Sequence, residues 1–183
     1  MRMFTRILAA FALVLALAGA ATAQGLTPEQ QQALSDRVAS FDTAMKANDM
    51  KSVMGVVPPK VLDKIAATYN VTIDELLVAM QQQMDEAMKS VTIVSFGMDL
   101  PAAEYITLAD GTTYAMIPTE TVIDLGANGG KMKATSKTLG LLDGETWYLV
   151  RVDDPAQATM LKEIYPAFAD VEFPPAVTEP VTE

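Results

Sequence analysis

The spacing of the apolar residues changes near residue 90, and this change constrains the fold more than any other feature. Up to Ser90 the apolar residues return every three or four positions, which is the period of an amphipathic helix. From Val91 to about residue 152 they alternate with polar residues, which is the period of a strand. We therefore expect an α+β fold in which helices come first and an antiparallel sheet follows.

Start and stop signals divide the helical part into segments. Thr27-Pro28-Glu29-Gln30 and Thr72-Ile73-Asp74-Glu75 have the pattern of capping boxes, and Asn70 suits a left-handed helix end. Asp154-Pro155 is a third start signal, near the C-terminus. The predicted helices span about 28–47, 50–54, 59–69, 73–88 and 155–165.

Tight-turn sequences divide the strand-rich part. Asp110-Gly111 and Asp143-Gly144 favour hairpins, and the glycine-rich stretch 126–130 favours a looser turn. Because the connections are short, consecutive strands are expected to pair antiparallel in a meander. Pro118 interrupts the third strand and indicates a bulge or an edge position. The predicted strands span about 90–98, 103–109, 112–124, 131–142 and 145–152.

The first 23 residues have the pattern of a secretory signal peptide. Arg2 and Arg6 precede the apolar run 7–18, and Ala21-Thr22-Ala23 is a small-x-small cleavage site. The mature protein is expected to begin at Gln24 and to be periplasmic or secreted. The apolar run is too short to span a bilayer, and the chain has no cysteine for a lipid or a disulfide. We predict no membrane anchor.

Composition indicates how the rest of the chain is organised into domains and limits the classes of partner that it can bind. Residues 24–168 are expected to form a single domain, and residues 169–183, rich in proline and acidic residues, a disordered tail. The net charge of −10 repels phosphate backbones, so nucleic acid is excluded as a partner. Acidity is otherwise typical of a well-dispersed exported protein.

The order of elements resembles the NTF2-like superfamily of cone-shaped α+β proteins. The resemblance covers about residues 28–152 and rests on helices followed by a curved meander. The meander ends in Asp143-Gly144-Glu145-Thr146-Trp147-Tyr148-Leu149-Val150-Arg151-Val152, a turn followed by Gly-x-Trp-x-hydrophobic. The resemblance implies a sheet that wraps the long helix and leaves a cavity. Members of the superfamily use this cavity as an enzyme site, a ligand pocket or a protein interface. The predicted C-terminal helix is an addition to this pattern.

Catalysis has few candidate residues. The chain has no histidine, which removes His-based acid-base chemistry, nucleophilic triads with histidine, and His-ligated zinc. Carboxylate and tyrosine chemistry of the isomerase type remains, with Asp99 or Glu120 as the base and Tyr105 or Tyr114 as the hydroxyl donor. Each of these residues equally fits an ordinary turn or sheet position.

Methionines are the second unusual feature. Met80, Met84 and Met88 lie four apart, so their thioethers share one helix face and could hold Cu(I). Because they extend an apolar stripe, core packing is the favoured interpretation, and we expect no metal and no cofactor. A methionine-lined cavity could instead hold a flexible apolar ligand. The residues predicted to line such a cavity are Met80, Met84, Tyr105, Tyr114, Met116 and Trp147.

Lys131, Lys133 and Lys137 share one face of the fourth strand and form a basic row on an acidic protein. The row is either the solvated side of the sheet or a contact site for an acidic partner, including a second copy that pairs through the sheet. Together these features predict an exported, non-catalytic binding module for a small apolar ligand or a protein partner. The alternatives are a His-free isomerase or lyase and a structural envelope-interaction protein.

Overall fold

We describe the protein from a computed structural model, which covers residues 26–47, 49–126 and 129–181. The predicted signal peptide and the cleavage point before Gln24 lie outside these residues. Within the described part, no helix is both long and apolar enough to cross a membrane.

Five α-helices form where the capping signals predict them. Thr27 and Thr72 close both capping boxes, with their hydroxyls accepting from the backbone N–H of Gln30 and Glu75 at 3.2 Å. Asn70 ends the third helix in the left-handed conformation, with φ of 54°. The helices are α1 (Pro28–Lys46), α2 (Met50–Met54), α3 (Pro59–Tyr69), α4 (Ile73–Ala87) and α5 (Pro155–Ile164).

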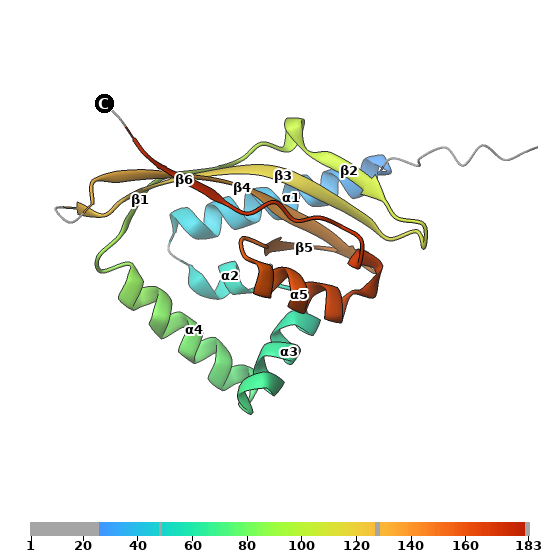
Figure 1. Cartoon of the computed structure of the whole chain (residues 1–183), viewed down its shortest axis with the longest axis horizontal. Coiled ribbons are helices and arrows are strands. Elements are labelled where there is room, and N and C mark those ends of the chain that lie inside the picture. Colours follow the sequence, from blue (N-terminus) through green and yellow to red (C-terminus); the bar gives the residue numbers. More distant parts are fainter. Residues whose placement is uncertain (1–25, 48, 127–128, 182–183) are drawn as a thin grey trace, which may run out of the picture.

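The strands form one strongly curved antiparallel sheet that follows the helical region (Figure 1). Two long central strands pair along their whole length, and each carries two shorter strands on its outer edge. The expected α+β class and the curved sheet are therefore confirmed. The strands are β1 (Thr92–Met98), β2 (Glu104–Thr107), β3 (Thr113–Asp124), β4 (Lys131–Asp143), β5 (Thr146–Arg151) and β6 (Val177–Pro180).

One predicted pairing is wrong, because β1 and β2 do not pair with each other. Both pair with β3, whose twelve residues leave room for β1 beyond residue 118 and for β2 before it. The short 3₁₀ helix Leu100–Ala102 fills the break, and the Asp99 N–H donates to the carbonyl oxygen of Pro118 at 2.9 Å. The N–H and C=O groups of one strand residue point toward the same neighbouring strand. The N–H that Pro118 lacks would therefore face this break, so its absence removes no hydrogen bond from the ladder.

The C-terminal segment also differs from the expectation of a disordered tail. Val171 and Phe173 pack against the core, and residues 177–180 pair with β4 at 132–135, beyond the point where β5 ends. The Val181 N–H donates to the Lys131 carbonyl at 2.9 Å, and Glu179 forms an ion pair with Lys133. Proline and acidic content predicted disorder, but the edge of β4 supplies the backbone partners that the segment itself lacks.

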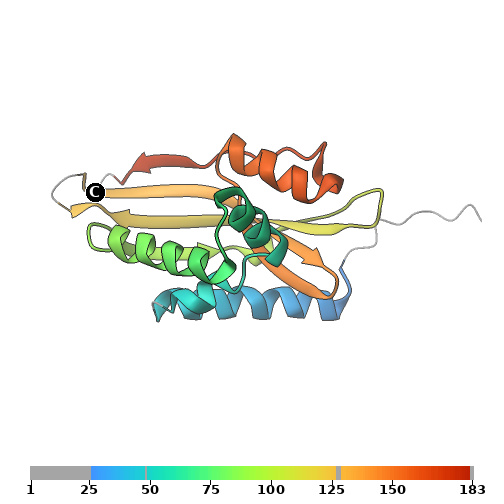
Figure 2. The same cartoon turned by 90° about the horizontal axis from the view of Figure 1, so that it is seen from below.

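Helices cover both faces of the sheet, so the core has two main layers. Figure 2 shows α1 and α5 on opposite sides of the strands. The first layer joins α1 and the α2–α3 connection to β3 and β5 through Leu34, Val38, Val56, Ala115, Ile117, Trp147 and Leu149. The second joins α3, α5 and the C-terminal segment to the other face through Val61, Tyr114, Met116, Leu139, Leu141, Val152, Leu161 and Phe168.

Candidate functional site

The candidate site is a solvent-open hollow of about 580 Å³ on the sheet face opposite α1. Its floor is the side chains of Tyr114 and Met116, which are only 5% and 6% exposed. Ile106 and Leu108 form one wall, from β2 and the turn after it, and the C-terminal segment forms the other wall through residues 167–174. The hollow thus lies between β2, which ends at Thr107, and the C-terminal segment.

Tyr114 is the most constrained residue of the floor. Its ring meets Phe168 edge to face, with ring centroids 5.2 Å apart. Burial, with the nearby Glu104 carboxylate as a second cause, raises the pKa of the Tyr114 phenol above its ordinary value. A tyrosine phenol is protonated at neutral pH in any case, so the Tyr114 hydroxyl can donate a hydrogen bond.

The rim of the hollow is acidic. Lys137 Nζ is 2.7 Å from a Glu104 carboxylate oxygen, so this pair is neutral as a unit. Asp110 accepts from the Thr112 N–H at 2.9 Å, and this backbone hydrogen bond lowers the pKa of Asp110. Asp170 and Glu172 also line the hollow and form no hydrogen bond or ion pair with another described residue. The uncompensated charge around an apolar floor is therefore negative.

The structure brings together only two of the six predicted ligand-lining residues, Tyr114 and Met116. Tyr105 is 41% exposed. Its strand neighbours Glu104 and Ile106 line the hollow, so the Tyr105 side chain projects from the opposite face of the sheet. Met80 and Met84 are half-buried on α4, and Met84 packs against Ala44 and Val53 rather than against the sheet.

The predicted pairing of Met116 and Trp147 in one cavity is wrong. Met116 lies opposite Leu139 on β4, whereas Trp147 lies opposite Leu142. Positions 139 and 142 have opposite parity, so the two side chains project from opposite faces of the sheet. Trp147 is 2% exposed in the layer against α1, where its Nε1 donates to the Gln30 carbonyl at 2.9 Å. It closes that layer and lines no part of the hollow.

The candidate catalytic residues also lie apart. Asp99 and Glu120 are exposed and line a different open hollow, of about 530 Å³, beside Pro118. Asp99 accepts from the Ala102 N–H at 3.2 Å, and Glu120 is 3.9 Å from Lys133 Nζ. Tyr114 lines the first hollow and Tyr105 neither. No candidate carboxylate therefore shares a hollow with a candidate tyrosine.

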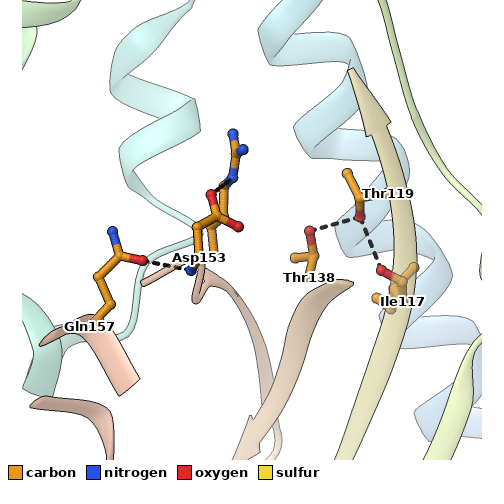
Figure 3. A network of polar contacts seen from close by, with 6 residues as sticks. Ile117, Thr119, Thr138, Asp153 and Gln157 are labelled. Atoms are coloured by element: carbon orange, nitrogen blue, oxygen red, sulfur yellow. Dashed lines mark hydrogen bonds and ion pairs between the residues drawn. The ribbon is translucent and has the colours of Figure 1, made fainter. Parts of the chain in front are cut away.

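Two groups of polar contacts lie outside the hollow (Figure 3), and only the first is buried. The hydroxyls of Thr119 and Thr138 are 2.8 Å apart between the central strands, and Thr119 also donates to the Ile117 carbonyl at 3.0 Å. Asp153 is paired with Arg151, and its N–H donates to Gln157 at 2.8 Å. The threonine pair links the middle of β3 to the middle of β4, and the Asp153 contacts lie at the start of α5. Across the described residues no cluster of acidic side chains is arranged to hold a metal ion.

The basic row of β4 is largely neutralised within the molecule. Lys133 pairs with Glu179 of β6 at 2.9 Å and Lys137 with Glu104 of β2 at 2.7 Å. The hydrogen bond and charge of Glu179 raise the pKa of Lys133. These two ion pairs connect β4 to the short strands β6 and β2.

Sequence reasoning missed the walls of the hollow. The alternation in 103–109 predicts that Ile106 and Glu104 lie on the same face of the strand, and this pattern could have identified Ile106 as a wall residue. Val171 and Pro174 could not be found, because their segment was expected to be disordered. No protein-family model, curated protein or solved structure matches the chain, so the site is interpreted from its own geometry.

Proposed function

We propose that this chain is an exported, non-catalytic binding module that holds a small ligand in the hollow between β2, β3 and the C-terminal segment. The observation that carries the proposal is the apolar floor of Tyr114 and Met116 beneath walls from two distant parts of the chain. A volume of about 580 Å³ is in the range of small-molecule sites. The NTF2-like resemblance is part of the same proposal, since helices followed by a curved sheet are compatible with it.

The rim favours a ligand with an apolar body and a positively charged end. Asp110, Asp170 and Glu172 supply negative charge, and the single cation of the rim, Lys137, is occupied by Glu104. Apolar burial would supply affinity, and the rim charges would orient the ligand and select its sign. An anionic amphiphile would meet repulsion in the same place.

Calorimetric titration with three decyl amphiphiles tests the proposal. Decyltrimethylammonium should bind one to one and most tightly, decyl maltoside more weakly, and decyl sulfate least. Leu108→Asn should weaken binding of the neutral maltoside by about 5- to 30-fold, because part of the apolar wall is lost. Val78→Asn is the matched control, since Val78 is 57% exposed on α4, far from the hollow.

A second pair of variants separates the rim from the general acidity of the protein. The double change Asp170→Asn and Glu172→Gln should weaken binding of the cationic probe by about two- to fivefold per carboxylate and leave the maltoside unchanged. Asp74→Asn on α4 removes one exposed negative charge elsewhere and should change neither. If no amphiphile binds, or if Leu108→Asn and Val78→Asn behave alike, this hollow is not a ligand site.

A further inference from the structure

The C-terminal segment, which runs from α5 to β6, has one firm and one weak attachment (Figure 2). At its start Phe168 is fully buried, and its ring centroid lies 5.2 Å from that of Tyr114 and 6.1 Å from that of Phe173. At its end β6 has no buried side chain, and Val177 is 62% exposed. Backbone hydrogen bonds and one ion pair therefore hold β6 to β4, with little apolar burial.

Between these attachments, residues 171–175 form a wall with open space on both sides. Val171, Glu172 and Pro174 line the candidate hollow, and they also line another hollow, of about 670 Å³, against α5. No backbone hydrogen bond joins residues 172–176 to any other residue in the described part of the chain. Segments with few hydrogen bonds and open surroundings are those that open locally. The position of this wall therefore depends on the attachment of β6.

The backbone ladder between β6 and β4 shows which residues make that attachment. The Val181 N–H donates to a β4 carbonyl at 2.9 Å, just beyond the antiparallel pairing of β6. Hydrogen-bonded and non-hydrogen-bonded positions alternate along such a ladder, so Val177 and Glu179 also direct their N–H groups to β4. The backbone of Thr178 points outward, as does that of Pro180, where a missing N–H removes no bond.

Negative charge lies on both sides of the candidate hollow. Asp110 belongs to the wall that follows β2, whereas Asp170 and Glu172 belong to the C-terminal segment. In the empty hollow these like charges repel one another and favour movement of the C-terminal wall away from β2. A ligand with a positively charged end lies between them and favours the closed arrangement.

We propose that β6 is a releasable latch that controls access to the hollow, an inference that rests on the proposed ligand site. While β6 is paired with β4, residues 171–175 are held in place and the hollow can enclose a ligand. When β6 detaches, this wall is free to move, and the ligand enters or leaves. Because the ligand binds better with the wall in place, ligand binding and β6 attachment stabilise each other.

Hydrogen exchange of the whole chain measures the latch directly. We expect the Glu179 and Val181 amides to exchange by local opening, faster than the amides between β3 and β4. Decyltrimethylammonium at about ten times its dissociation constant should slow both amides about tenfold, and decyl sulfate at the same concentration should have little effect. The Leu125 N–H, which donates to the Gly130 carbonyl at 2.9 Å in the turn between β3 and β4, is the control amide and should not respond.

A matched pair of proline variants tests the ladder. Val177→Pro should speed exchange of the Val181 amide by about two- to tenfold, because one hydrogen bond between β6 and β4 is lost. Thr178→Pro, at the next position of the same exposed strand, removes only an outward N–H and should leave this exchange nearly unchanged. Thermal melting of both variants checks that the rest of the fold is intact.

The outcomes separate the latch from the ligand site. If decyltrimethylammonium binds but leaves the exchange of Val181 unchanged, the hollow is a ligand site without a latch. If no decyl amphiphile binds, the ligand site and the latch that depends on it both fail. Exchange of Glu179 and Val181 as slow as that of the central ladder, or equal effects of the two prolines, also overturns the proposal, because β6 would then be a fixed part of the sheet.

Discussion

At the scale of single residues, two apolar side chains singled out from the sequence, Trp147 and Met84, have different surroundings. Trp147 is enclosed between α1 and the sheet, with its indole N–H satisfied by Gln30. Met84 is only half-buried, on a helix that extends away from the sheet (Figure 1). Residue type alone could not separate these environments, because both side chains lie on apolar stripes of the sequence.

Trp147, the only tryptophan, should report a dry environment. We expect blue-shifted fluorescence that acrylamide quenches only weakly in the folded protein and strongly after unfolding. A cationic amphiphile in the hollow should leave this emission nearly unchanged, since Trp147 belongs to the opposite layer. Emission typical of an exposed indole would contradict the burial of Trp147 against α1.

Met84→Ala should lower the free energy of unfolding by about 1 kcal/mol, below the 2–5 kcal/mol typical of a fully buried site, because the Met84 side chain is only partly buried. Leu34→Ala, at a fully buried position in the core of α1, is the comparison and should cost the full amount. Urea unfolding of both variants measures the difference. Equal losses would show that α4 packs more tightly than its exposure indicates. Added Cu(I) should not raise the melting temperature of the unchanged protein.

At the scale of elements, local signals predicted all five helices and the first five strands. Capping boxes, turn dipeptides and apolar periods act within a few residues, so they can be read directly from the chain. These local signals do not predict which strand edge each short strand pairs with. The break opposite Pro118 and the edge of β4 that β6 occupies are set by the unequal lengths of strands far apart in sequence.

The contact between α3, the end of β4 and α5 should be sensitive to alkaline pH. The Tyr165 hydroxyl donates to Asp143 at 3.2 Å, and Lys60 Nζ is 2.7 Å from Asp143 and lies over the Tyr165 ring. Burial, followed by the Asp143 charge, raises the pKa of Tyr165 above its ordinary value near 10. Below that pH the phenol is protonated in both states. Above it the unfolded chain loses the proton first, so stability falls as pH rises.

Tyr165→Phe should therefore flatten the loss of unfolding free energy above pH 10 while lowering stability modestly at neutral pH. Denaturant unfolding at several pH values measures both effects, with Tyr69→Phe as the control, because Tyr69 is exposed on α3. Lysines that also titrate in this range contribute equally to both variants. An unchanged slope in Tyr165→Phe would mean that the phenol is solvated in the folded protein.

At the scale of the whole molecule, the candidate hollow was only half predictable. Tyr114 and Met116 follow from the alternation of β3, but the opposite wall comes from a segment that begins some fifty residues later. Trp147 projects from the sheet face opposite the hollow because of how β3, β4 and β5 are aligned with one another. This alignment is the pairing register, which the sequence of a single strand does not determine. The charge of the rim was visible in the sequence only as overall acidity.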